Sequence, residues 1–216
     1  MNTAVRLIVL NSTKTGDSSL VLHCLCREMD RRGFLTTVRK GGSRALYQPF
    51  SILDAEAVVN TKSDLWRVRG VSSVHPLTGI RSSFDKTAMV MFMSEVLYRS
   101  LQEGASEDGL YDWCERSILT LDAIDGDFAN YHLRWLLELA GVLGFAPSFE
   151  TLAPFAGENL RDISDLLSAG FGQFMVYPLT GAKRSAIAES LLRYLSVHLE
   201  IPLNIRSLAV LGELYR

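Results

Sequence analysis

The period of the apolar residues changes once along this chain, near Pro76, and this change limits what the chain can fold into. Before Pro76 the apolar pattern has period two, as in Phe34–Arg39. That period is typical of strands that bury one face. After Pro76, apolar residues recur every three or four positions, as amphipathic helices require. The sequence therefore predicts an α+β chain, with a β-rich N-terminal part followed by an all-helical part.

Several segments before Pro76 have the β-branched and aromatic content of strands, and turn-prone stretches separate them. Short strands that follow one another at this spacing predict a small closed barrel. We place the barrel in residues 1–80 and the helical domain in residues 81–216. The expected strands are 5–10, 20–26, 34–39, 52–59 and 65–74, with one helical turn at 45–47 after the Gly41-Gly42 break.

The helical part begins with a strong N-terminal signal. Ser82 and Asp85 resemble a capping box that opens a helix at 84–101. Its stretch Ala88–Met93 is apolar on nearly every side, which predicts a central position in the domain. Further helices are expected at 109–121, 127–143, 160–168, 185–199 and 205–215.

The formal net charge of -2 conceals an uneven distribution. Residues 1–80 contain 11 basic and 6 acidic side chains, a net charge of +5, whereas residues 81–216 contain 11 and 18, a net charge of -7. Positive charge gathered on a small barrel attracts phosphates, which favours nucleic-acid binding. The alternative is a chance variation in solvated surface charge.

Basic residues gather around one predicted hairpin and the loop that follows it. Arg39, Lys40 and Arg44 are the strongest candidates for phosphate contacts. Bases of a single strand stack on aromatic side chains, and Tyr47, Phe50 and Trp66 are nearby; the alternative is that these rings fill the barrel or its contact with the helices. The full set of candidate nucleic-acid-binding residues is Arg27, Arg31, Arg39, Lys40, Arg44, Arg67 and Arg69.

Enzyme signatures are missing from the sequence: it has no Walker loop, no Gly-x-Gly-x-x-Gly, no Gly-x-Ser-x-Gly and no His-Glu-x-x-His. The four histidines are scattered, which favours structural roles. Two metal-site alternatives stay open, the acidic loop 122–127 as a hydrolase centre and Cys24-x-Cys26 beside His23. A solvated loop with a helix N-cap and a pair of core thiols explain them more simply. We predict a non-enzymatic protein without cofactor or metal.

No apolar run reaches the roughly 18 residues of a membrane span, and the N-terminus lacks the pattern of a signal peptide. A cytoplasmic protein without membrane contact is therefore expected.

Three N-terminal segments resemble the RecO family of recombination mediators. They are Thr15–Leu20, then Val38–Gly41, then Leu46–Phe50, whose Gln-Pro-Phe element is the most specific. The likeness continues through residues 94–98, 136–145 and 203–208, so it spans nearly the whole chain.

The resemblance implies an OB-fold barrel joined to a helical domain. It also implies a protein that binds single- and double-stranded DNA, anneals complementary strands and acts at the nucleoid during repair. With a RecR-type partner, such proteins help RecA to replace the single-stranded DNA-binding protein (SSB). The acidic C-terminal tail of SSB would need a basic spot on the helical domain, for which the candidates are Arg134, Lys183 and Arg184. The alternative is an OB-fold interaction scaffold that does not bind DNA.

Two features depart from the family pattern. Many members carry a four-cysteine zinc element in the helical domain, but residues 145–175 contain no cysteine here, and zinc is therefore not expected. The loop after the third strand is also shorter and less basic, with only Gly41–Arg44 before Leu46. This shorter loop predicts weaker DNA binding at that position.

Overall fold

The structure is a computed structural model, and it describes residues 2–29, 31–38, 44–60, 63, 65–104 and 108–214. The chain forms two compact units that interleave along the sequence. Unit 1 comprises Met1–Thr78 and Leu97–Leu119, and unit 2 comprises Gly79–Val96 and Thr120–Arg216. The two helices within residues 84–123 are each divided between the units, because residues 97–119 belong to unit 1. The domain boundary at residue 80 stays a prediction.

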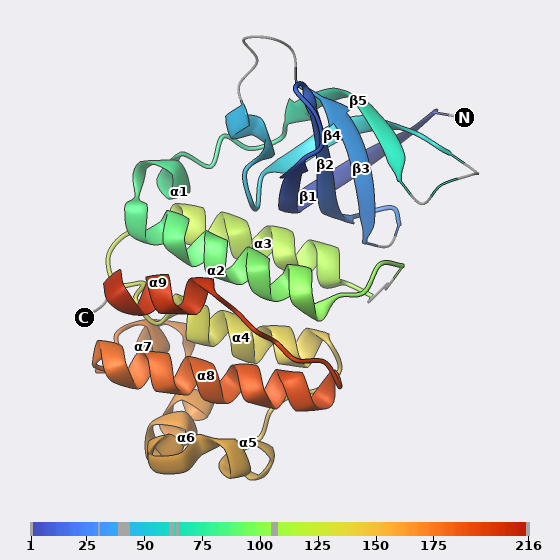
Figure 1. Cartoon of the computed structure of the whole chain (residues 1–216). Helices are drawn as coiled ribbons and strands as arrows, with labels where there is room; N and C mark the ends of the chain where they lie inside the picture. Colours follow the sequence, from blue (N-terminus) through green and yellow to red (C-terminus); the bar gives the residue numbers. More distant parts are fainter. Residues whose placement is uncertain are drawn as a thin grey trace. The chain divides into compact units, whose positions relative to one another are not determined.

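Unit 1 contains a closed five-stranded barrel with the strand order β1-β2-β3-β5-β4 (Figure 1). Every pair around the barrel is antiparallel except β3 with β5, which is parallel. A closed barrel followed by helices is the predicted fold class, and this prediction is confirmed. The elements are β1 (Asn2–Lys14), β2 (Ser19–Cys26), β3 (Arg32–Thr37), the 3-10 helix η1 (Arg44–Tyr47), β4 (Ile52–Val58) and β5 (Trp66–Ser73).

Two irregularities bend the strands enough to close the barrel. A register shift between Val9 and Asn11 lets β1 pair with β4 in its first half and with β2 along its second. A second shift lies where β4 meets β5 between Asp54 and Glu56, opposite Gly70. Gly70 has φ 61°, in the left-handed region that favours glycine, as expected at a bulge.

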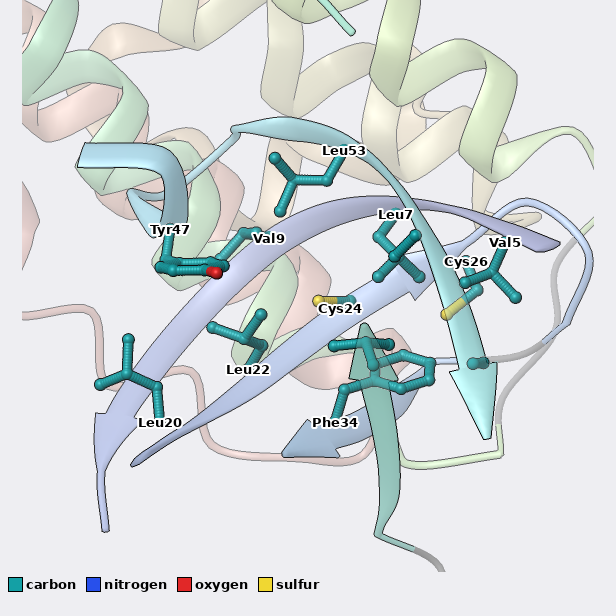
Figure 2. Packing of buried hydrophobic residues seen from close by; sticks show 13 residues of the cluster. Val5, Leu7, Val9, Leu20, Leu22, Cys24, Cys26, Phe34, Tyr47 and Leu53 are labelled. Carbon is teal, nitrogen blue, oxygen red and sulfur yellow. The ribbon is translucent and has the colours of Figure 1, made fainter. Parts of the chain in front are cut away.

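The barrel core is formed by alternate residues of the strands, which point inward from every side (Figure 2). Leu7, Leu22, Phe34 and Leu53 are among its fully buried members. Cys24 and Cys26 belong to the same cluster (Figure 2), so the interpretation of these thiols as core residues is confirmed. Burial raises the pKa of the Cys24 thiol well above its ordinary value, which keeps it protonated and unreactive.

In unit 2, α4 and α8 lie side by side, and α5 and α9 both pack on α8 (Figure 1). Buried apolar side chains of α4 and α8, Trp135 and Tyr194 among them, form the centre of this unit. The helices of the chain, as described, are α1 (Thr78–Ser82), α2 (Phe84–Ser100), α3 (Leu110–Ala123), α4 (Tyr131–Val142), α5 (Phe149–Ala156), α6 (Leu160–Ser168), α7 (Phe171–Met175), α8 (Gly181–His198) and α9 (Ser207–Leu214), with the 3-10 turn η2 (Gly157–Asn159).

The start of α2 differs from the predicted capping box. The hydroxyl of Ser83 accepts the Lys86 N–H (3.3 Å), whereas Ser82 is the last residue of α1 and donates to the Gly79 carbonyl. Predicting Ser82 as the cap was therefore wrong by one residue, because the short helix α1 intervenes. The sequence also gave no sign of α5 and α7, whose segments contain the prolines and glycines that usually separate helices.

Every helix in the described ranges is too short or too polar to span a lipid bilayer.

Candidate nucleic-acid interface

A hollow of about 710 Å³ lies between β3 and β5 in unit 1. Its walls are the end of β3 (Leu35–Thr37) with Val38 after it and the middle of β5 (Arg67–Val71), and η1 contributes Leu46 and Tyr47. The hollow exists because the parallel β3–β5 ladder is short, pairing Phe34 with Trp66 and Leu35 with Arg67. A hollow of this size falls in the range that buries a small ligand or a few groups of a polymer.

Arg67 and Arg69 line this hollow from β5, and both are exposed. They alternate with buried Val68, so their side chains leave the same face of the strand, roughly 6.6 Å apart along it. Glu56 of β4 lies directly opposite Arg69 in the antiparallel ladder. Its carboxylate reduces the local positive potential at this end of the hollow.

The other predicted cations on this side are less completely placed. Arg44 opens η1 and is exposed, two residues before Leu46 of the hollow. Arg39 and Lys40, the strongest sequence candidates, lie outside the described residues. On this side of the barrel, Arg44, Arg67 and Arg69 are therefore the candidate phosphate-binding groups among the described residues.

Two predicted cations have roles inside unit 1 instead. Arg31 is only 7% exposed; its guanidinium donates to the Leu101 carbonyl (2.5 Å) and stacks on the ring of Tyr98 at 4.7 Å. Arg27 is exposed but pairs with Asp112 at 3.1 Å. Arg31 is not part of the candidate interface, because a buried guanidinium that binds the carbonyl of Leu101, just after α2, is not accessible to phosphate.

The three aromatic candidates belong mainly to the interior of unit 1. Phe50 is fully buried and Tyr47 is 8% exposed, although Tyr47 forms part of the hollow's wall. Trp66 packs against the barrel core, and the guanidinium of Arg32 covers its ring at 4.3 Å. For Phe50 and Trp66 the structure therefore agrees with the alternative that they fill the fold.

The candidate partner-binding cations of unit 2 all contact groups of their own unit. Arg134 pairs with Glu138 (2.6 Å), and Arg184 donates to the Leu179 carbonyl (2.9 Å). Lys183 pairs with Asp162 (2.7 Å) and holds the pKa of that carboxyl below its usual range, but its side chain remains 51% exposed. Lys183 is thus the most accessible of the three.

The acidic loop proposed as a metal centre has a structural role at Asp122. Its carboxylate accepts the Ile80 N–H (2.8 Å), and its carbonyl accepts from Lys86 Nζ (3.0 Å). A Cβ on Gly79 would lie 2.0 Å from that carbonyl, so only glycine allows this close approach. Among the described residues, no group of three or more His, Cys, Asp or Glu side chains could hold a metal ion.

The apolar part of the hollow was not predicted from the sequence. Leu35, Leu46 and Val71 are ordinary strand and turn residues, and only the tertiary structure brings them together. The one available signal was the period-two pattern of β3, which places Leu35 on the face opposite Phe34.

A closed barrel of this strand order followed by helices defines the class, an OB-fold protein with a helical part. Comparison with known proteins identifies the family. The family model described as "Recombination protein O C terminal" matches residues 81–154. The DNA repair protein RecO of Bacteroides fragilis is 31% identical over 168 residues, covering 76% of this chain and 67% of that protein.

Two further relatives extend the match over the barrel. The DNA repair protein RecO of Phocaeicola vulgatus is 28% identical over 96% of this chain and 97% of its own length. That of Flavobacterium psychrophilum is 25% identical over the whole of both chains. The chain belongs to the RecO family of DNA repair proteins.

Proposed function

We propose that this chain is a recombination mediator that holds the backbone of DNA on its barrel without reading sequence and anneals complementary strands. The hollow between β3 and β5, with Arg67 and Arg69 in its wall, carries this proposal. Guanidinium groups bind phosphate oxygens in a bidentate manner, and such contacts carry no base information. Membership of a DNA repair family supports nucleic acid as the ligand.

The charges around the hollow give a direct test through three variants. Arg67→Gln and Arg69→Gln each remove one phosphate contact, whereas Glu56→Gln removes the opposing carboxylate beside Arg69. We expect each arginine variant to bind single-stranded DNA about five- to tenfold more weakly at low salt, and Glu56→Gln to bind more tightly. Fluorescence anisotropy with a labelled oligonucleotide measures all three.

The salt dependence separates phosphate contacts from other effects. For about five neutralised phosphates, log affinity for a single strand falls against log salt with a slope near -3.5, and loss of one contact reduces the slope by about 0.7. Arg99→Gln, an exposed cation of α2, is the control and should leave both affinity and slope unchanged. A wild-type protein that does not bind DNA at low salt would overturn the proposal and favour an OB-fold scaffold that binds proteins only.

We further propose that unit 2 receives the acidic C-terminal tail of SSB near the start of α8, and that a RecR-type partner and RecA act with the protein on SSB-coated strands. The exposed ammonium of Lys183 is the best placed cation for a tail carboxylate. Charge reversal of Lys183 also removes its pair with Asp162, so the variant leaves two neighbouring carboxylates to repel the tail.

Lys183→Glu should weaken binding of a labelled tail peptide at least tenfold and slow the annealing of SSB-coated oligonucleotides, while annealing of bare oligonucleotides stays at the wild-type rate. The matched control is Arg99→Glu in unit 1. Equal peptide affinity in Lys183→Glu and wild type would exclude this residue as the anchor.

A further inference from the structure

A second hollow, of about 520 Å³, lies on the other side of the short β3–β5 ladder. Its lining comes from the end of β4 and the start of β5, with Val58, Val59 and Leu65 as its apolar part. Leu35 and Arg67 line both this hollow and the one of about 710 Å³. The two hollows therefore adjoin at a ridge, from which the exposed side chain of Arg67 projects.

The strand edges in the larger hollow supply hydrogen-bonding groups. On one side β3 pairs with β2 along its length, and Val38 continues that edge by donating to the Ser18 carbonyl. On the side that faces β5, the described part of the ladder ends at Leu35. The backbone groups of Thr36–Thr37 and Val68–Val71 that do not pair with β2 or β4 thus border a space that is partly lined by apolar side chains.

This combination matches a nucleobase better than a duplex or a peptide. A base has apolar faces and hydrogen-bonding edges, and both are accessible only when the base is unpaired and unstacked. An added peptide strand requires one continuous free edge, but the paired residues Leu35 and Arg67, which line both hollows, interrupt the space between them. A nucleotide chain can cross this ridge, because its backbone lies outside while consecutive bases enter on either side.

We propose that the two hollows hold two neighbouring unpaired bases of a single strand, with Arg67 on the phosphate between them. This inference rests on the proposed DNA binding and adds a ligand class and a path: the strand runs along β5 and places its bases into the barrel wall. It assigns Leu35, Val59 and Val71 to contact with bases. The phosphate contacts proposed above involve arginines only.

Abasic oligonucleotides test the inference, because they keep the phosphates and lose the bases. Wild-type protein should bind a mixed-sequence strand of about 12 nucleotides at least tenfold more tightly than a fully abasic strand of equal length. A second substrate has two unpaired nucleotides flanked by duplex. Its affinity should fall by the same factor when both of these nucleotides are abasic. Equal affinity for normal and abasic strands would overturn base insertion while leaving DNA binding intact. Binding of neither strand would instead overturn the proposed function.

Variants that fill the hollows locate the site. Val71→Trp fills the larger hollow and Val59→Trp the smaller, and each should lower affinity for the normal strand about tenfold without changing affinity for the abasic strand. Retained abasic binding also reports that each variant is folded. Val197→Trp, at a residue of α8 that is 61% exposed, is the control. Unchanged affinity for the normal strand in both hollow variants would exclude these hollows as the base site. Binding of an acidic peptide, but not of DNA, at the hollows would assign them to a protein partner.

Discussion

At the scale of single residues, the ionisation of His132 of α4 is strongly altered by its surroundings. It is 2% exposed, its ring meets that of Phe92 edge-on at 5.8 Å, and Arg184 is close enough to act on it electrostatically. Burial, and then the charge of Arg184, lower the pKa of His132 from 6.5 to about 3. The folded protein therefore keeps this imidazole neutral at physiological pH.

This buried imidazole predicts a loss of stability in mild acid. The unfolded chain binds a proton at His132 below about pH 6.5, whereas the folded chain does so only near pH 3. Unfolding thus takes up a proton in this window, and the free energy of unfolding falls as the pH falls. Between pH 7 and pH 5 this contribution amounts to about 2 kcal/mol.

Urea unfolding of wild type and His132→Gln at the two pH values measures this contribution. The variant should lose about 2 kcal/mol less than wild type on acidification, whatever its stability at pH 7. Val197→Gln, at an exposed residue of α8 that does not titrate, is the control and should keep the wild-type pH dependence. Equal pH dependence in His132→Gln and wild type would show that the imidazole is protonated in the folded state.

At the scale of elements, the strands were easier to predict than their pairing. Period-two segments placed β2 and β4 to within about a residue at each end, and the Gly41-Gly42 break and Pro49 bracketed the helical turn that became η1. The parallel ladder between β3 and β5 could not be predicted, because its partners are about 30 residues apart and share no local signal. The candidate site depends on that ladder, so its two arginines were predictable and its apolar wall was not.

Helix α9 is an element whose position depends on a distant residue. The carboxylate of Glu95, on α2, accepts the backbone N–H groups of Arg206 and Ser207 (3.2 and 2.9 Å) and the Ser207 hydroxyl (2.6 Å). A carboxylate at a helix N-terminus satisfies its free N–H groups and complements the helix dipole. Sequence alone located α9 but did not indicate that its N-terminus would be capped from more than 100 residues away.

At the scale of the whole molecule, the barrel depends on a segment that follows it in sequence. Residues 97–119 belong to unit 1, and their contacts with the barrel include Arg31 with the Leu101 carbonyl, Arg27 with Asp112, and His23 with Glu103 at 3.6 Å. A fragment of residues 1–80 loses these contacts and leaves the Arg31 guanidinium without its carbonyl partner. The fragment also lacks Leu97, Leu101 and Tyr111, which belong to unit 1 and are buried.

We therefore expect fragment 1–80 to be less stable than the barrel of the full chain by about 3 kcal/mol or more, the effect of exposing two large apolar side chains. Trp66, the only tryptophan in residues 1–80, reports its unfolding by fluorescence. Fragment 1–119, which contains all of unit 1, is the control and should unfold cooperatively. An unfolding midpoint for fragment 1–80 equal to that of the full chain would contradict this dependence.

The sequence by itself determined the order of elements, the barrel-then-helices class, the core role of Cys24 and Cys26 and the uneven charge, because these follow from local periodicity and composition. Tertiary structure alone decided which cations remain accessible. Arg31 and Arg67 look alike in the sequence, yet one lies against Tyr98 and the other lines an open hollow. The reason is physical: burial and strand pairing depend on contacts between residues far apart in sequence, which no local pattern encodes.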